Sequence, residues 1–198
     1  MQPIMARRPD GTLSMMCLPP EFSAFLLEIP SLMDADDRPE AQSRLYPHPT
    51  ADDDEANAEW ERMMHPDLFH LIAAARDIVV ADLKLLRRTR KLPTGGQLNI
   101  PADHCNAWIS AIQTVRSVLG ATHGFDAEDM EDISILSEPG ERSGAMMRLH
   151  VLGDVQGLLI SESQLEPGGE SPDDAAADEY DDGDDLDFDF DWIGDGTG

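Results

Sequence analysis

The sequence contains few cysteines and no long run of apolar residues. Its two cysteines, Cys17 and Cys105, lie far apart and match neither a metal-binding spacing nor a disulfide framework, which fits a reducing compartment. No stretch approaches the roughly 20 apolar residues that cross a bilayer. Residues 1–11 hold no apolar run of signal-peptide length. These absences predict a cytoplasmic protein with no membrane partner.

Basic residues are also scarce. The chain has 14 Lys and Arg against 40 Asp and Glu, and its formal net charge is −26 at pH 7. Direct binding to a phosphate backbone needs clustered Lys and Arg, and anionic lipid surfaces attract basic segments. The composition therefore argues against nucleic acid and anionic membranes as direct partners. An acidic surface also simply keeps a protein soluble.

Motifs of the common enzyme and cofactor classes are missing. There is no Walker loop, no Gly-rich dinucleotide fingerprint, no nucleophile elbow, no zincin helix and no Cys-x-x-Cys pair. His65 and His70 are five residues apart and would lie on different faces of a helix. The adjacent His104 and Cys105 would also point in different directions. We therefore predict no catalytic residue, no cofactor and no metal site.

One polar cluster keeps an enzymatic alternative open. It combines both signs of charge with a histidine within nine residues of sequence, across the predicted break at Pro66. A catalytic carboxylate would need burial or a like charge nearby, whereas Glu59 and Arg62 can equally form a surface ion pair. An enzyme would need a polar cleft here or at His104. The cluster consists of Glu59, Glu61, Arg62, His65 and Asp67.

Apolar residues recur at helical spacing in five segments, which predicts a mainly α-helical protein. The pattern is clearest in 66–90, where Leu71, Ile78 and Leu85 widen the main stripe, so this helix is expected to be central to the core. The main stripe consists of Leu68, Ile72, Ala75, Val79, Leu83 and Leu86. The five predicted helices are 20–33, 52–65, 66–90, 101–123 and 143–163.

Several of these helices have predicted inward faces. In the second helix the inward residues are Trp60, Met63 and Met64, and Pro66 is predicted to separate this helix from the next. Gly153 and Gly157 each weaken the last helix by about 1 kcal/mol relative to Ala, unless a closely packed neighbour offsets the loss. The inward faces of the last two helices are Trp108, Ile112, Val115 and Leu119, and then Met147, Val151, Val155 and Leu158.

The segments between the helices are short or polar. Residues 12–18 and 97–100 are predicted to be extended, and each is followed by a proline and a helix, so they could pair as a small two-stranded ribbon. Residues 34–51 are predicted to be a loop, and the acidic segment 125–143 could hold one helical turn. We expect a single compact, bundle-like helical domain at 12–163, preceded by a flexible N-terminus at 1–11.

The last part of the chain differs in composition. Residues 161–198 contain 15 Asp and Glu and no basic residue, and from Glu166 the chain is rich in Pro, Gly and Asp. Such a segment buries too little apolar surface to fold alone, so we predict a disordered acidic tail at 164–198. Near its end, acidic and large apolar residues alternate, as in a short docking peptide. The residues that could dock on a partner are Phe188, Phe190, Trp192 and Ile193.

A basic cluster at the end of the central helix is one surface on which this tail could fold back. A purely solvating tail is the alternative, and the sequence leaves the oligomeric state open. The cluster consists of Lys84, Arg87, Arg88, Arg90 and Lys91.

Several segments together resemble a bacterial family known as domain of unknown function two thousand and seventeen. They are Arg-Pro-Asp-Gly-Thr at 8–12, Pro-Glu-Phe at 20–22, Arg-Leu-Tyr-Pro at 44–47, Glu-Ala-Asn-Ala-Glu-Trp-Glu-Arg at 55–62 and Ala-Trp-Ile-Ser-Ala-Ile-Gln-Thr-Val-Arg-Ser-Val-Leu-Gly at 107–120. The resemblance implies a helical cytosolic protein without an assigned activity, and it carries over no catalytic residue. Some relatives are encoded near the Clp protease adaptor, which implies a link with proteostasis by association.

Three functional hypotheses follow. The leading one is a non-enzymatic interaction or regulatory protein, in which a helical domain displays a groove or face to a protein partner and the tail acts as a tethered ligand. The second is an enzyme with a polar cleft near residues 59–67 or 104. The third is an acidic nucleic-acid mimic that occupies a basic DNA-binding partner.

Overall fold

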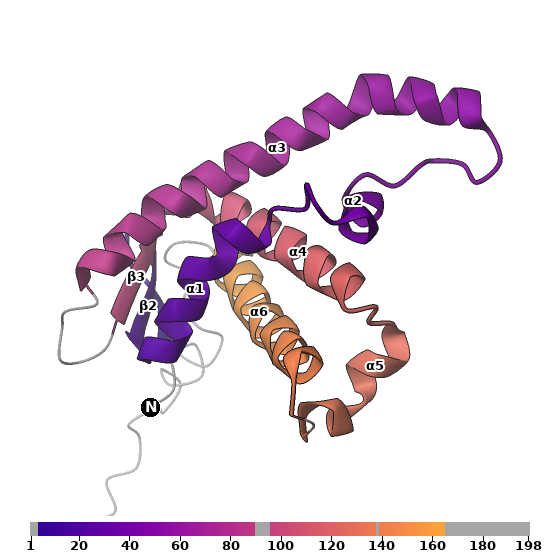
Figure 1. Ribbon diagram of the computed structural model, residues 1–198. Coiled ribbons are helices and arrows are strands. Elements are labelled where there is room, and N and C mark those ends of the chain that lie inside the picture. Colours follow the sequence, from indigo (N-terminus) through magenta and orange to yellow (C-terminus); the bar gives the residue numbers. More distant parts are fainter. Residues whose placement is uncertain (1–3, 90–95, 138, 165–198) are drawn as a thin grey trace, which may run out of the picture. The chain divides into compact units, whose positions relative to one another are not determined.

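The computed structural model describes residues 4–89, 96–137 and 139–164, without the side chains of 87–89. All described residues belong to one compact unit. Within them the protein is mainly helical, as predicted (Figure 1). The helices are α1 (Pro20–Leu32), α2 (Pro39–Leu45), α3 (Asp54–Thr89), α4 (Cys105–Thr122), α5 (Ala127–Glu131) and α6 (Glu141–Gln164).

A small antiparallel sheet joins the two extended segments. Its strands are β1 (Ile4–Arg7), β2 (Leu13–Leu18) and β3 (Gly96–Ile100), in the order β1-β2-β3. The pairing of β2 with β3 confirms the predicted ribbon. Residues 4–7, which carry no strand signal in the sequence, also pair with β2. The tight turn between β1 and β2 has Gly11 at φ +80°, a conformation that glycine adopts readily.

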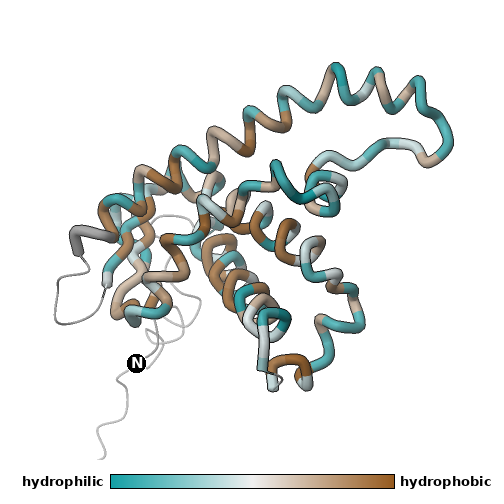
Figure 2. The backbone as a smooth tube through the Cα atoms, viewed as in Figure 1, coloured by the Kyte–Doolittle hydropathy of each residue, from teal (hydrophilic) through white to brown (hydrophobic). Residues whose placement is uncertain are grey.

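The core is centred on α4. Trp108 and Ile112 are completely buried, and α4 packs against α2, α3 and α6. The predicted stripe of α3 is confirmed in its C-terminal half, where Val79 and Leu86 are completely buried. Figure 2 shows hydrophobic residues gathered along α4 and α6. Gly124 ends α4 with φ +62°, as expected for a left-handed helix cap.

The predicted break at Pro66 is wrong, because a single helix of 36 residues runs through it. A proline inside a helix removes one N–H donor and crowds the carbonyl one turn earlier, without forbidding the helix. Asp53 stabilises the start, since its carboxylate accepts a hydrogen bond from the backbone N–H of Ala56 at 2.9 Å. The predicted inward face is wrong for two of its three residues: Met63 is 57% exposed and Met64 43% exposed, while Trp60 is half-buried.

Two further predictions need correction. Residues 34–51 contain the short helix α2, which begins at Pro39 and buries Ala41 against Val118 of α4. In α6 the buried face is rotated from the predicted one, so Met147 and Leu158 are exposed although Val155 is buried. Apolar residues line both faces of α6, and the sequence does not distinguish which of the two faces packs on α4. The residues of α6 that are buried are Ala145, Met146, Leu149, Leu152, Val155, Gln156 and Leu159.

Candidate functional site

A mainly apolar hollow surface lies between α1, α6 and the edge strand β1. Two adjoining hollows, of about 370 Å³ and about 470 Å³, share Phe22 and Val151 in their walls. We call this surface the α1–α6 groove. Its other principal apolar walls are Ile4, Met15, Phe25, Met147 and Leu158.

The second apolar face of α6 forms one wall of the groove. Met147, Val151 and Leu158 are the residues that the sequence analysis placed in the core, and here they face the groove instead. Met147 is 55% exposed and Leu158 is 47% exposed. Contiguous exposed apolar surface of this kind commonly marks a binding site. The helical periodicity therefore identified a real apolar face of α6, but this face lines the groove and does not pack in the core.

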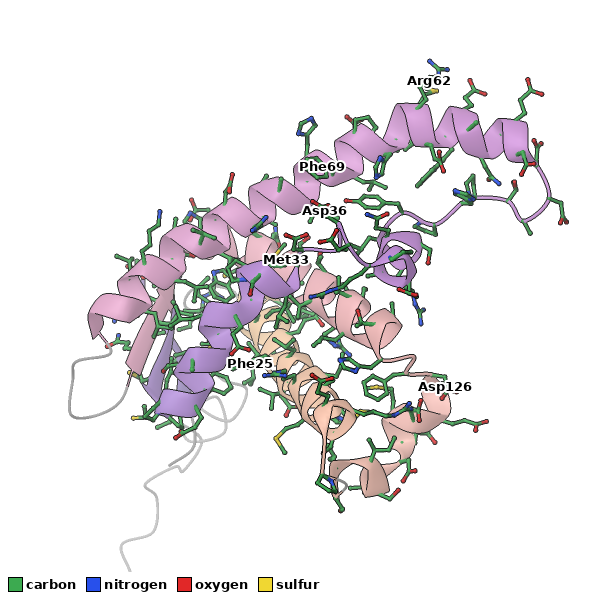
Figure 3. All side chains as sticks on the ribbon, viewed as in Figure 1. Phe25, Met33, Asp36, Arg62, Phe69 and Asp126 are labelled. Carbon is green, nitrogen blue, oxygen red and sulfur yellow. The ribbon has the colours of Figure 1, made fainter. Side chains whose placement is uncertain are left out.

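The opposite wall comes from α1 and the sheet. Phe25 lies on the side of α1 that faces α6 (Figure 3), and the Arg148 guanidinium lies 5.8 Å from its ring centroid. Arg148 also forms an ion pair with the Glu28 carboxylate at 3.4 Å, so this rim of the groove carries a paired positive charge. At the other end, Arg7 donates a hydrogen bond to the carbonyl of Glu162 at 2.9 Å, which ties β1 to the end of α6.

The two predicted docking elements are not brought together by the described part of the structure. Phe188, Phe190, Trp192 and Ile193 lie outside the described residues. In the predicted basic cluster, Lys84 is exposed on α3, while Arg90 and Lys91 and the side chains of Arg87 and Arg88 are not described. Docking by these residues stays a prediction.

The polar cluster at 59–67 lies largely at the surface. Glu59 and Arg62 form the expected helical ion pair, at 3.9 Å, with both side chains more than 60% exposed. Glu61 contacts Nε2 of His48 at 2.7 Å. His65, one turn after Glu61, packs edge-on against Tyr46 with ring centroids 4.1 Å apart. A polar hollow of about 340 Å³ thus joins two residues of the predicted cluster to two that sequence reasoning missed.

The contributions of Tyr46 and His48 come from the segment after α2, which carried no helical or strand signal. Their place in the cluster becomes visible only when the fold brings segments that are distant in sequence into contact. Among the described residues, no group of three or more His, Cys, Asp or Glu side chains is placed to hold a metal ion.

His104 belongs to a buried polar contact that the sequence did not suggest. Both oxygens of Asp82 lie 3.1 Å from Nδ1 of His104, and the indole N–H of Trp108 donates to Asp82 at 2.8 Å. Asp82 is 3% exposed. A buried carboxylate is costly unless it is hydrogen-bonded, and these two donors offset that cost. Asp82 lies on α3 beside the apolar stripe, and this position is its only sequence signal.

Cys105 follows His104 and is buried. Its thiol lies 3.5 Å from the carbonyl of Pro101, and burial raises the pKa of the thiol above its usual value. A raised pKa keeps the sulfur protonated and weakly nucleophilic at neutral pH. The geometry around His104 therefore supports a structural contact more than a reactive thiol.

Comparison with known proteins gives one match. The family model described as Domain of unknown function (DUF2017) matches residues 16–163. No curated protein matches the chain, and no solved structure matches it either. None of the described helices combines the length and the apolar character required to cross a membrane.

Proposed function

Because the chain belongs to the DUF2017 family, whose domain has no assigned function, we propose its function from its surfaces. We propose that it is a non-enzymatic interaction protein of the cytosol that binds a short protein segment in the α1–α6 groove. The observation that carries the proposal is the exposure of large apolar walls on both sides of the groove, with Ile4 53% and Met147 55% exposed. Apolar side chains that stay exposed to water do not stabilise the fold, whereas a binding surface needs apolar side chains that a partner can cover.

The chemistry of the groove favours an apolar segment. Three methionines, Met5, Met15 and Met147, line it. Met15 is buried beneath the surface, whereas Met5 and Met147 are accessible to a ligand, and flexible methionine side chains adapt to varied apolar ligands. Arg148 at the rim is paired with Glu28, and Glu21 and Asp154 also line the groove, so the binding that we propose rests on apolar contact. The strand β1 lies at the edge of the sheet, and an edge strand can pair with an added extended peptide.

The chain itself contains a segment with this chemistry, 186–193, Leu-Asp-Phe-Asp-Phe-Asp-Trp-Ile. In an extended peptide successive side chains point to opposite faces. The leucine, both phenylalanines and the tryptophan would then share one face, and the three aspartates and Ile193 the other. We propose this segment as a ligand of the groove, in the same chain or as a model for a similar segment of a partner.

Covalent geometry permits the intramolecular case. α6 ends at Gln164, and residues 165–185 separate it from the proposed ligand. A chain of this length reaches at most about 70 Å, at 3.3–3.6 Å per residue. The whole of α6 is shorter, about 36 Å at 1.5 Å per residue. Tethering would raise the effective concentration of the segment at the groove.

Photo-crosslinking from within the groove tests the proposal. We would place a benzophenone amino acid at Met147 in the full chain, with a matched variant at Ile133, which is 76% exposed and does not line the groove. We expect crosslinks from position 147 to residues 186–193, lost when Phe188, Phe190 and Trp192 are replaced by Ser, and none of these from position 133. Equal crosslinking from both positions, or crosslinks that survive the replacement, would contradict the proposal.

The two other hypotheses have less support. General acid–base chemistry favours groups whose environment perturbs them, whereas the side chains of His48 and Glu61 are 53% and 55% exposed. Replacing both by Ala should leave the interaction of the groove unchanged. A nucleic-acid mimic should compete with DNA for a basic partner, with a competition that weakens as salt is added.

A further inference from the structure

A second apolar surface runs along α3. It begins at Trp60 and ends at Leu85, and its positions are separated by alternating steps of four and three residues. This spacing is the heptad repeat of helices that pair in coiled coils. We call this surface the α3 seam. It consists of Trp60, Met64, Asp67, Leu71, Ala74, Ile78, Ala81 and Leu85.

The seam differs from the stripe of α3 that packs on the core. At 100° per residue it lies about a quarter turn around the helix from Val79 and Leu86. None of its eight residues is buried. Leu71 is 66% exposed, Leu85 is 49% exposed and Met64 is 43% exposed. Helices α1, α2 and α4 all lie on one side of α3 in Figure 1.

The large residues of the seam follow a strict seven-residue interval. Met64, Leu71, Ile78 and Leu85 occupy one set of heptad positions. The alternate set, apart from Trp60, holds Asp67, Ala74 and Ala81, which are smaller. This seven-residue repeat is maintained over about 32 Å of helix. Surface apolar residues that are scattered singly would not show such a regular interval.

We propose that the α3 seam binds the α3 seam of a second copy of this chain, with the two helices antiparallel. A two-fold axis midway between Leu71 and Ala74 places Leu71 of one copy opposite Ala74 of the other, and Ala74 opposite Leu71. The same register places Met64 opposite Ala81 and Leu85 opposite Trp60. Large side chains thus meet small ones in two of the four layers, as interdigitated packing requires. A two-fold axis makes one surface complementary to itself.

Charge favours the antiparallel direction. Residues 54–71 of α3 contain five acidic residues and one arginine, a net charge of −4, while residues 72–89 contain four basic residues and two aspartates, a net charge of +2. Antiparallel helices place the acidic half of one copy beside the basic half of the other. Parallel helices would place like charges together, which is unfavourable along a helix pair.

Asp67 provides a sensitive test, because it is the only charged position in the seam. In the dimer it lies opposite Ile78, and burying a carboxylate there weakens association. Asp67→Leu should therefore tighten the dimer, whereas Leu71→Asp should break it. Glu131→Leu is the matched control, because it makes the same change of charge at an exposed position of α5.

Sedimentation velocity on the full chain measures these effects. We expect the 21.8 kDa chain to form dimers at micromolar concentration, Asp67→Leu to lower the dissociation constant at least tenfold, and Leu71→Asp to give monomers. Glu131→Leu should change nothing. A chain that is monomeric at all concentrations, or a dimer that Leu71→Asp leaves intact, would overturn the proposal.

Disulfide trapping tests the direction of the two helices. Met64→Cys and Ala81→Cys chains are mixed and oxidised, with the unsubstituted chain as the control for Cys17 and Cys105. Antiparallel pairing predicts disulfides between the two different variants. Disulfides of Met64→Cys chains with one another would show parallel pairing and would also overturn the proposal.

Discussion

The buried contact of Asp82 with Trp108 and His104 leads to a quantitative prediction. Trp108 is completely buried, so its indole N–H has no access to water when its acceptor is removed. Leaving a buried donor unsatisfied costs about 1–3 kcal/mol. The side chain of His104 is 29% exposed and can reach water, so its loss of a partner adds little. Removal of the buried carboxylate also ends its own desolvation cost, which offsets part of the loss.

We therefore expect Asp82→Ala to lower the free energy of unfolding by about 2 kcal/mol, with the unsatisfied indole as the main cause. Asp82→Asn should cost less, about 1 kcal/mol, because the amide oxygen can still accept from the indole. Urea unfolding followed by far-ultraviolet circular dichroism measures both losses, in the full chain and without dependence on tryptophan fluorescence.

A double-mutant cycle with Trp108→Phe identifies the cause. If the orphaned indole N–H dominates, Asp82→Ala should cost clearly less in the Trp108→Phe background than in the unsubstituted chain. An equal cost in both backgrounds would refute the reasoning. So would an Asp82→Ala variant that is as stable as Asp82→Asn.

Three other predictions concern single sites. Gly157→Ala should stabilise the fold by about 1 kcal/mol, because an added Cβ meets nothing within 4 Å. Gly96→Ala should destabilise the fold, because its Cβ would lie 2.8 Å from Oγ of Ser23. Thermal unfolding should show a raised melting temperature for the first variant and a lowered one for the second. Pro66→Ala restores a helical N–H donor and should slow amide exchange in residues 54–65, with a gain of up to about 3 kcal/mol in local helix stability; unchanged exchange would mean that Pro66 is not strained. Burial raises the pKa of Cys105, so its thiolate forms only at higher pH, and a thiol reagent at pH 8 should modify Cys17 first and Cys105 only after unfolding.

The sequence was sufficient for the elements with one clear apolar face. The helix of Trp108 has a single stripe and a glycine cap, and its C-terminal end and its buried residues are as predicted, while the α-helix begins at Cys105 rather than at 101. The extended segments were also correct, because each is short and followed by a proline. The short helix α2 was missed because its seven residues bury mainly Ala41, which leaves no periodic signal.

Helices with two apolar faces were harder to interpret. α3 and α6 each have one face in the core and another that is exposed, and periodicity alone does not rank the two faces. Leu71 and Leu85 therefore looked like core residues, and Met147 was assigned inward. The same ambiguity explains why the groove was expected in general terms while its walls were not identified. Polar partners that come from distant segments, such as Asp82 and His48, require the fold itself.

Methionine methyl resonances offer the most direct test of the groove as a docking site. Met5, Met15 and Met147 line the groove, while Met63 lies exposed on α3 and serves as a reference. Spectra of the full chain would be compared with those of a chain in which Phe188, Phe190 and Trp192 are replaced by Ser. We predict that the three groove methyls shift and the methyl of Met63 does not. Unchanged groove methyls would contradict docking of this segment in the α1–α6 groove.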